Sequence, residues 1–348
     1  MAVTDVETGV ALSAYTTFRV GGPARRLVVA ETEADLERLV RELDARGEPL
    51  LVLGGGSNVL VSDNGFDGTV VKVATSGIEA DVSDCAGALV TVAAGEDWER
   101  LVARTVAEGW SGLEALSGIP GSVGASPLQN IGAYGADVSQ TIANVRTMDR
   151  HTGQRRTFAT ADCRFGYRDS RFKAEPGRYL ILSVTFQLAL GSLSAPVRYP
   201  ELARVLGVEL GRRVPATDVR EAVLGLRRSK GMVLDDADPD TWSAGSFFTN
   251  PLLTPAQAAT LPPDAPRFAQ PDGRVKTSAA WLIDRAGFGK GYGSGQATLS
   301  TKHTLALTNR GHARAQDLLA LAAEIRAGVE AAFQIRLVPE PLLVNCEL

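Results

Sequence analysis

A long stretch with many glycines and few charges, residues 110–138, constrains the fold more than any other part of this sequence. It shows neither a helical nor a strand period, yet it lacks the charged residues of an ordinary solvent loop. Long loops inside compact domains are usually functional, because their backbone polar groups need partners. We therefore expect residues 119–135 of this stretch to wrap a ligand, and the alternative is a purely structural loop.

A shorter glycine stretch comes earlier in the chain: Gly54-Gly55-Gly56-Ser57-Asn58 follows a short apolar strand expected over residues 49–53. We call residues 54–58 the first glycine stretch and residues 110–138 the second. Glycines let backbone N–H groups approach a phosphate without a side chain in the way. The stretch is not a P-loop, since no Gly-Lys-Ser/Thr follows, and it does not match GxGxxG. Alone it fits an ordinary tight turn equally well. Together the two stretches predict a pair of phosphate-binding loops.

Composition excludes several classes of function. The chain has 348 residues, 45% of them hydrophobic, and a net charge of −4, which suits two or three domains. Basic residues form no long run, so we expect neither a nucleic-acid nor a membrane partner. No apolar run reaches the roughly 18 residues of a membrane span, and residues 1–13 do not resemble a secretory signal. The three scattered cysteines and the absence of CxxC or HxxxH predict a reduced cytoplasmic protein without a metal site.

Hydrophobic periodicity predicts alternating helices and strands. Thr32 is the expected N-cap of the first helix, and Gly109 is expected to end the second. The expected helices cover residues 32–46, 97–108, 217–228 and 313–333. The expected strands cover residues 68–73, 89–94, 179–190, 305–309 and, less regularly, 334–344. Exposed loops are expected over residues 235–240 and 264–272.

A series of segments, in a fixed order, resembles one enzyme family. The segments are TTFRVGGPA at 16–24, the two glycine stretches, RFGYRDSRFK at 164–173, AGSFFTNP at 244–251, residues 276–284 and residues 338–340. Their order resembles that of UDP-N-acetylenolpyruvoylglucosamine reductases, also called UDP-N-acetylmuramate dehydrogenases, over residues 12–344. Residues 198–202, RYPEL, resemble the tyrosine-bearing loop of the type I subfamily.

The resemblance implies an α+β fold of the vanillyl-alcohol oxidase type, with two α/β FAD-binding domains and a C-terminal substrate domain. These would be residues 1–74 plus 331–348, residues 75–228 and residues 229–330. It further implies non-covalent FAD, with NADPH as co-substrate. The substrate would be UDP-N-acetylglucosamine enolpyruvate, reduced to UDP-N-acetylmuramate in cytoplasmic peptidoglycan precursor synthesis. No obligate protein partner is expected.

The same resemblance assigns roles to individual residues. Arg168 would grip the substrate carboxylate through two hydrogen bonds, Ser246 would donate a proton, and Glu340 would lie beside the pyruvyl group. Outside the family context they fit a surface arginine, a turn cap and a solvated glutamate. The residues implied to bind FAD are Arg19, Gly54, Gly55, Gly56, Ser57, Asn58, Ile119, Gly121, Ser122, Gly124, Ala125, Ser126, Gln129, Asn130 and Gly132. The residues implied to bind substrate are Tyr167, Tyr199, Lys230, Asn250 and Lys276, and the loop with Tyr199 would close over the sugar nucleotide.

Two other functions fit a flavin-binding chain of this kind. An FAD-linked oxidase of the same superfamily would often attach its flavin through His or Cys, and neither glycine stretch contains one. A flavin-binding module without activity would be expected to lose residues such as Arg168, Ser246 and Glu340, which all stand in intact motifs.

The sequence departs from the family pattern at Val338, Pro341, Asn345 and the pair Gly231-Met232. These positions concern the packing of the last strand and of the loop after Lys230, and they leave the residues assigned to chemistry in place.

Overall fold

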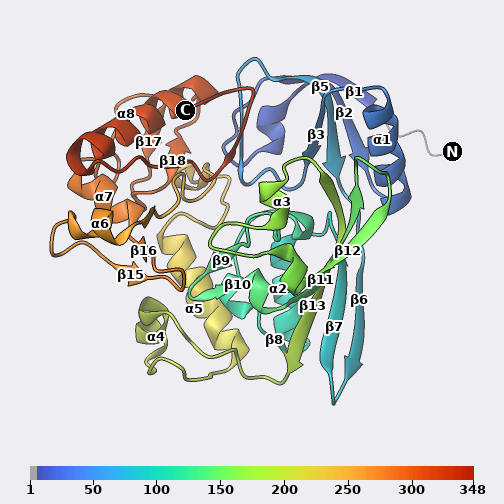
Figure 1. Ribbon diagram of the computed structural model, residues 1–348, viewed down its shortest axis with the longest axis horizontal. Coiled ribbons are helices and arrows are strands. Elements are labelled where there is room, and N and C mark those ends of the chain that lie inside the picture. The colour runs from blue at the N-terminus through green and yellow to red at the C-terminus, as the bar shows by residue number, and fades with distance from the viewer. Residues whose placement is uncertain (1–5) are drawn as a thin grey trace. The chain divides into compact units, whose positions relative to one another are not determined.

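The computed structural model describes residues 6–348 and divides into two compact units (Figure 1). The first unit comprises Ala24–Gly55 and Asp67–Arg228, with the segment that precedes Ala11. The second comprises Ala11–Pro23, Gly56–Phe66 and Ser229–Leu348. The chain thus passes from one unit to the other within the first glycine stretch. The expectation for residues 1–13 falls partly on residues 1–5, outside the described residues, and the three-domain division remains a prediction.

A four-stranded sheet runs in the order β1-β2-β5-β3. Its strands are β1 (Val6–Ala11), β2 (Pro23–Ala30), β3 (Leu50–Leu53) and β5 (Phe66–Val73). Helix α1 (Glu33–Ala45) connects β2 to β3, which is parallel to β5. Thr32 Oγ1 accepts a hydrogen bond from the Asp35 N–H at 3.1 Å, so the predicted N-cap is confirmed.

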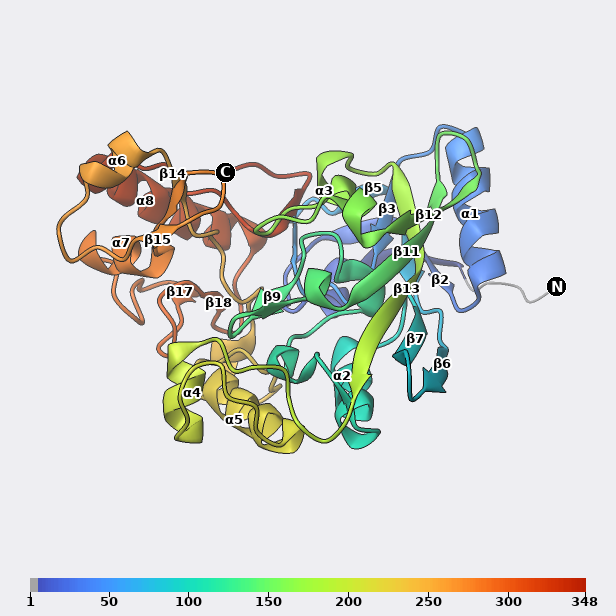
Figure 2. The same cartoon turned by 60° about the horizontal axis from the view of Figure 1, so that its bottom comes forward.

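An antiparallel sheet supplies the centre of the first unit, in the order β12-β11-β13-β7-β6. Figures 1 and 2 show β13 between β11 and β7, and β8 also pairs with it. The strands are β6 (Ile78–Ser83), β7 (Gly87–Ala93), β8 (Trp110–Ser111), β11 (Ile142–Asp149), β12 (Arg155–Ala159) and β13 (Tyr179–Leu190). β13 matches the predicted strand residue for residue. Its side chains pack with those of α1 and β7 in one buried cluster.

The remaining elements of the first unit frame the second glycine stretch. Helix α2 (Trp98–Ala107) precedes it, and Gly109 ends the helix with a φ of +69°, as predicted. The stretch itself holds only short pieces, among them the hairpin of β9 (Gly132–Ala133) and β10 (Ala136–Asp137). Three helices follow: α3 (Arg171–Ala174), α4 (Pro200–Leu206) and α5 (Ala216–Ser229). Figure 2 shows α4 beside α5, where Leu202 packs with Val219 and Val223.

The second unit has its own apolar core around helix α8 (Ala315–Phe333). Leu318, Leu321, Ile325 and Val329 of α8 are buried on the predicted stripe. The other helices are α6 (Pro255–Ala259) and α7 (Ala279–Arg285). The strands are β4 (Val59–Val61), β14 (Leu252–Leu253), β15 (Phe268–Ala269), β16 (Val275–Lys276), β17 (Ala297–Leu299), β18 (Leu307–Asn309) and β19 (Leu342–Val344). β19 pairs with β4 in parallel, so the last strand joins residues 59–61, which belong to the same unit.

Two expectations about local structure were wrong in part. Residues 334–344 were expected to be strand-like throughout, but only Leu342–Val344 form a strand. Residues 235–240 were expected to be exposed, and residues 235–237 are. Asp240 is buried, because its carboxylate accepts hydrogen bonds from Thr301 and Arg310.

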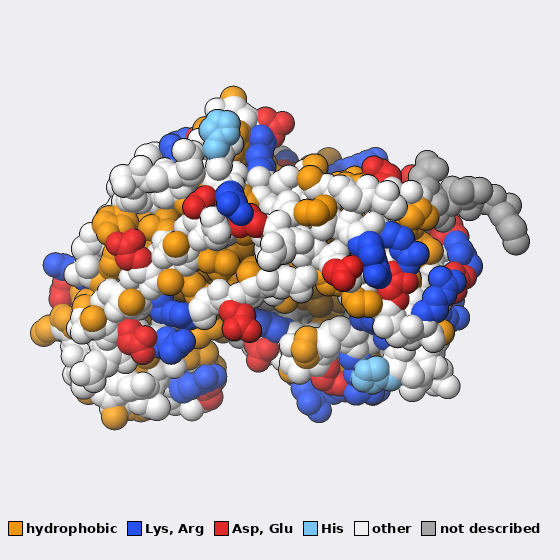
Figure 3. All heavy atoms as spheres, turned by 90° about the horizontal axis from the view of Figure 1, so that it is seen from above, with side chains coloured by type: hydrophobic (Ala, Val, Ile, Leu, Met, Phe, Trp, Pro, Cys, Tyr) orange, Lys and Arg blue, Asp and Glu red, His pale blue; other side chains and the backbone are white. Residues whose placement is uncertain are grey.

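The surface gives no sign of a large single-charge patch on the face drawn in Figure 3, where basic and acidic side chains are interspersed. Within residues 6–348, no helix is both long and apolar enough to cross a membrane.

Candidate active site

The first glycine stretch touches the second within the first unit. A Cβ on Gly55 would come 2.5 Å from the Cα of Gly121, and one on Gly54 would meet the hydroxyl of Ser122. Real Cβ atoms do not approach other atoms so closely, so only glycine allows the two backbones to come together here. The structure therefore brings together the two loops that the sequence predicts to bind phosphate.

The segment from the end of β7 to the start of α2 holds the second glycine stretch through backbone hydrogen bonds. The Trp98 N–H donates to Gly121 at 3.0 Å, and the Gly124 N–H donates to Ala94 at 2.8 Å. A Cβ on Gly124 would lie 2.6 Å from that of Ala94. Val123–Ala125 form one 3-10 turn, so Ala125 and Ser126 follow a tightly fixed backbone.

The buried hydroxyl of Ser126 tests whether the stretch fits a flavin nucleotide. Ser126 is 1% exposed, and its Oγ has no hydrogen-bond partner among the residues that the structure describes. A buried hydroxyl without a partner costs about 1–3 kcal/mol, so a ligand atom that bonds to it would stabilise the protein. With the close contact between the loops, this donor fits the phosphate or ring atoms of FAD.

Asn130, a predicted flavin ligand, also makes hydrogen bonds that hold neighbouring backbone in place. Its backbone has a φ of +46°, its side-chain N–H donates to Gly166 at 3.1 Å, and its side-chain oxygen accepts from the Ser139 N–H at 3.0 Å. The amide thus fixes the end of the glycine stretch, and its part in FAD binding remains a prediction. The same holds for Ile119, Gln129 and Gly132.

Arg168 lies against the end of this stretch. Its guanidinium donates to the carbonyl oxygens of Gly132 at 2.9 Å and Asn130 at 3.4 Å, and it lies 5.8 Å from the ring of Tyr167. The Ser170 hydroxyl also donates to Leu128 at 2.6 Å. The predicted carboxylate-binding residue is thus held beside a predicted flavin loop.

Lys72 was missed by the sequence reading. Its ammonium donates a hydrogen bond to the carbonyl oxygen of Gly54, and burial lowers the pKa of Lys72. A lysine among the apolar residues at the end of β5 was the available signal. Its position suggests that it fixes the first glycine of the loop.

In the second unit, Ser246 and Glu340 lie on two paired segments. The Glu340 N–H donates to Phe247 at 2.8 Å, the Thr249 N–H donates to Val338 at 3.0 Å, and Phe248 pairs with Pro339. This pairing brings together the predicted proton donor and the predicted carboxylate.

Asn58 joins the same group, because its side-chain N–H donates to the backbone carbonyl of Glu340 at 3.2 Å. Its backbone carbonyl accepts from the Leu342 N–H at 2.9 Å. Thr17 contacts the two residues before Asn58. The Thr17 N–H donates to the carbonyl oxygen of Gly56 at 3.1 Å, and the Thr17 hydroxyl donates to the carbonyl oxygen of Ser57.

The predicted substrate residues are divided between the two units. Asn250 accepts a hydrogen bond from the Ala279 N–H at 2.9 Å, and Lys276 pairs with Leu252 in the same small sheet. Lys230 follows the end of α5 in the chain. Tyr199 stands just before α4 in the first unit, where its ring meets that of Tyr134 edge-on at 5.5 Å.

Arg19, predicted to bind FAD, is held by residues of its own unit. Its backbone has a φ of +55°, and its guanidinium stacks on Trp242 at 4.1 Å and pairs with Asp236. A role at the flavin remains a prediction for this residue.

Comparison with known families identifies the class of protein. The FAD binding domain family matches residues 24–159, which include both glycine stretches. The family described as UDP-N-acetylenolpyruvoylglucosamine reductase, C-terminal domain, matches residues 238–344. The fold and the loops therefore define an FAD-dependent oxidoreductase.

Relatives narrow this class. The UDP-N-acetylenolpyruvoylglucosamine reductase of Cutibacterium acnes is 60% identical over 97% of this chain and 90% of its own length. The enzyme of the same name from Thermobifida fusca is 54% identical over 99% of both chains. The crystal structure of UDP-N-acetylenolpyruvylglucosamine reductase from Thermus caldophilus is 27% identical, covers 98% of this chain and 99% of its own, and has a TM-score of 0.68. The chain belongs to the UDP-N-acetylenolpyruvoylglucosamine reductase family. FAD is its cofactor and NADPH its co-substrate.

Proposed function

We propose that this chain reduces UDP-N-acetylglucosamine enolpyruvate to UDP-N-acetylmuramate with electrons from NADPH, in the cytoplasm. When bound, FAD supplies hydride transfer between NADPH and the enolpyruvyl double bond. The protein must then hold the substrate carboxylate, exclude water and deliver one proton to the carbon next to the ether oxygen. The residues described above supply groups suited to each of these tasks.

The observation that carries the proposal is the position of Arg168. Its guanidinium bonds to Gly132 and Asn130 at the end of the second glycine stretch, the stretch that also holds the buried Ser126 hydroxyl. A guanidinium can hold a carboxylate through two parallel hydrogen bonds. Arg168 would therefore hold the enolpyruvyl carboxylate close to the flavin.

Ser246 would supply the proton and Glu340 would assist it. A hydroxyl is a weak acid, so it needs a neighbour that orients it and restores its proton. The pairing of residues 247–249, which directly follow Ser246, with residues 338–340 supports this division of roles. Lys230 and Lys276 suit the charge of the diphosphate, Asn250 and Tyr167 would add hydrogen bonds, and Tyr199 would cover the sugar nucleotide.

The proposed function is tested by following NADPH absorbance with purified protein in the presence and absence of the enolpyruvyl sugar nucleotide. We expect a yellow protein that releases FAD on denaturation and consumes NADPH stoichiometrically with the sugar nucleotide. Consumption of NADPH that depends only on oxygen, or flavin that stays attached to the denatured chain, would instead point to an oxidase.

A further inference from the structure

Residues 192–216, which include Tyr199, form a loop that we call the tyrosine loop. Its first and last residues lie side by side and form its stem. Its two ends meet through backbone hydrogen bonds: the Ala216 N–H donates to Ser192 at 2.8 Å, and the Ser194 N–H donates to Val214 at 2.7 Å. Because the stem is closed, the position of Tyr199 depends on where the stem is fastened to the rest of the first unit.

One buried carboxylate fastens this stem. Glu114 is 1% exposed, and its two oxygens accept hydrogen bonds from two different segments. Oε1 accepts from the N–H of Ala195 at 2.5 Å, and Oε2 accepts from the N–H of Gly112 at 2.6 Å. Ala195 lies in the stem shortly before Tyr199, so Glu114 links the tyrosine loop directly to residues 112–114.

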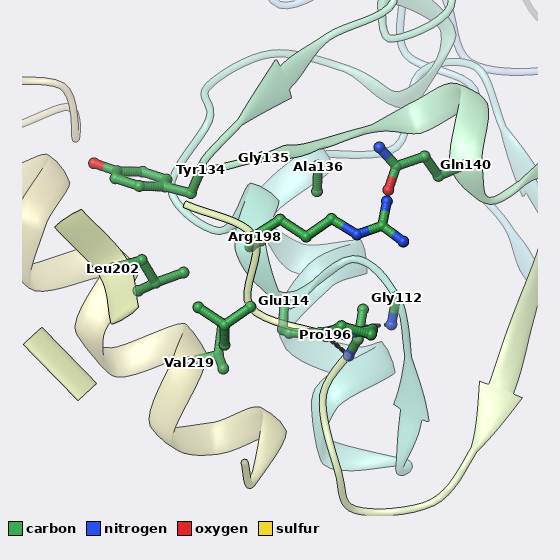
Figure 4. Close-up of a pocket in the computed structure, with 13 residues that line it drawn as sticks. Gly112, Glu114, Tyr134, Gly135, Ala136, Gln140, Pro196, Arg198, Leu202 and Val219 are labelled. Atoms are coloured by element: carbon green, nitrogen blue, oxygen red, sulfur yellow. Dashed lines mark hydrogen bonds between the residues drawn. The ribbon is translucent and has the colours of Figure 1, made fainter. Parts of the chain in front are cut away.

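A pocket lies beside the tyrosine loop. It measures about 50 Å³, and its lining includes Glu114, Tyr134, Gln140, Pro196 and Arg198. In Figure 4, Arg198 extends across this pocket toward Gln140. Groups that face a pocket have fewer packing partners on that side, so the hydrogen bond from Ala195 to Glu114 is a directional contact that helps to hold the loop.

Glu114 also lies near the start of the second glycine stretch. It opens the 3-10 turn Glu114–Leu116, and its backbone carbonyl accepts from the hydroxyl of Ser117 at 2.7 Å. The carbonyl of Leu116 accepts from the indole N–H of Trp98 at 3.1 Å. The same residue is therefore fixed to the backbone that forms the flavin loop and, through its side chain, to the tyrosine loop.

We propose that Glu114 is a positioning residue for substrate binding: its carboxylate sets the tyrosine loop, and with it Tyr199, in register with the second glycine stretch. The inference rests on the proposed function, because it assigns to Tyr199 a contact with the sugar nucleotide. Glu114 itself would touch neither the flavin nor the substrate.

The substitution Glu114→Gln tests this role, because it keeps the size of the side chain but turns one acceptor into an amide N–H₂. One of the two backbone N–H groups then loses its partner in a buried place. We expect the KM for the enolpyruvyl sugar nucleotide to rise about tenfold, the scale of one lost buried hydrogen bond. Reduction of the flavin by NADPH should keep its wild-type rate.

A double-mutant cycle with Tyr199→Phe separates positioning from general damage. If Glu114 acts through Tyr199, the double variant should have a KM close to that of the more affected single variant, because coupled residues are not additive. Glu99→Gln is the matched control. Glu99 also accepts an N–H near this stretch, from Gly118 at 2.5 Å, but it pairs with Arg220 rather than with the tyrosine loop. Its effect on the KM should add to that of Tyr199→Phe.

Ala195→Pro provides a second test of the same hydrogen bond if the Glu114→Gln variant does not fold. It removes the N–H that donates to Glu114 and also fixes φ at residue 195, and it should raise the KM in the same way. An unchanged KM in these variants, or effects of Glu114→Gln and Tyr199→Phe that simply add, would overturn the role of Glu114 while wild-type turnover continues. A wild-type protein that consumes no NADPH with the sugar nucleotide would instead overturn the proposed function.

Discussion

The backbone N–H of Glu340 donates to the carbonyl oxygen of Phe247 at 2.8 Å, and Phe247 directly follows Ser246. This bond fixes the register of the two segments without the use of the Ser246 or Glu340 side chain. Under the proposed function, the two side chains could therefore change their hydrogen bonds during the reaction while their backbones stay in place. Such preorganisation is what the proposed proton donor and its assisting carboxylate would require.

The contact between the two glycine stretches predicts an effect of Gly55→Ala on flavin binding. The added methyl would lie 2.5 Å from the Cα of Gly121, so one loop must move. We expect the variant to lose most of its bound FAD during gel filtration. The flavin content is measured as the ratio of absorbance at about 450 nm, in the flavin band, to absorbance at about 280 nm, in the protein band.

Gly225→Ala is the control for this change. Gly225 lies in α5, and nothing approaches its Cβ position within 4 Å. Alanine there should raise the free energy of unfolding by about 0.5–1 kcal/mol and leave the flavin content unchanged. Full FAD content in Gly55→Ala would contradict the role of the loop contact.

Arg168→Lys tests whether the guanidinium of Arg168 binds the carboxylate of the substrate. Lysine keeps the positive charge but cannot make two parallel hydrogen bonds, and it loses the bonds to Gly132 and Asn130. The kcat/KM for the sugar nucleotide should fall by about ten- to a hundredfold, the range for a hydrogen bond to a charged group. Reduction by NADPH should change little. Equal losses in both half-reactions would show that the variant disturbs the flavin site instead.

Asp240 predicts a pH dependence of stability. Burial opposes its ionisation, but hydrogen bonds from Thr301 and Arg310 outweigh burial and lower the pKa of Asp240 below its usual 3.8. A lowered pKa means that the folded state binds this proton less tightly than the unfolded state does. The resulting stability is fully present above pH 3.8 and is lost as the pH falls through the folded-state value.

Asp240→Asn should therefore cost about 1–3 kcal/mol of unfolding free energy at pH 7, because Arg310 loses its charged partner. Urea unfolding curves at pH 7 and below pH 4 should show the gap between variant and wild type shrinking in acid. A gap that is the same at both pH values would contradict the stabilising role of the ionised carboxylate.

Much of the fold could be predicted where local pattern and tertiary burial agree. The strand Tyr179–Leu190 is a long run of apolar and β-branched residues, and it occupies the middle of the antiparallel sheet. The stripe of α8 is buried for the same reason. The short strands β9, β10 and β14–β16 could not be predicted, because two residues carry no period and only their partners make them strands.

The error at residues 334–344 has a clear cause. Pro339 and Pro341 have no N–H to give to a sheet, and the N–H between them, on Glu340, bonds to Phe247 instead. Only after Pro341 can the chain pair with β4. The apolar run thus suggested one continuous strand. The prolines instead divide it into residues 338–340, which pair with residues 247–249, and the short strand β19.

The candidate site could be predicted in parts. The sequence predicts the glycine stretches and Arg168 from residue types adapted to phosphate and carboxylate, and their roles remain predictions. The sequence did not indicate Lys72 or Glu114, because the partner of each is a backbone group distant in the sequence, Gly54 for Lys72 and Ala195 for Glu114. A charged residue beside apolar ones can be seen in a sequence, but the backbone group that it contacts cannot.

Ser246→Ala should separate the two half-reactions. Flavin reduction by NADPH needs no proton from Ser246, so its rate should stay within a few-fold of wild type. Delivery of a proton to the substrate does need one, so the second half-reaction should slow by about 10² to 10⁴, the usual contribution of a positioned acid. This corresponds to roughly 3 to 5 kcal/mol of barrier. Ser246→Cys should recover part of the rate, since a thiol can also donate a proton.

The most direct test is stopped-flow absorbance of pre-reduced enzyme mixed, without oxygen, with the enolpyruvyl sugar nucleotide. The wild-type flavin should reoxidise rapidly as the substrate is reduced, and the flavin of Ser246→Ala should reoxidise slowly on the same substrate. A wild-type flavin that stays reduced would contradict the proposed function, and a Ser246→Ala flavin that reoxidises at the wild-type rate would contradict Ser246 as the proton donor.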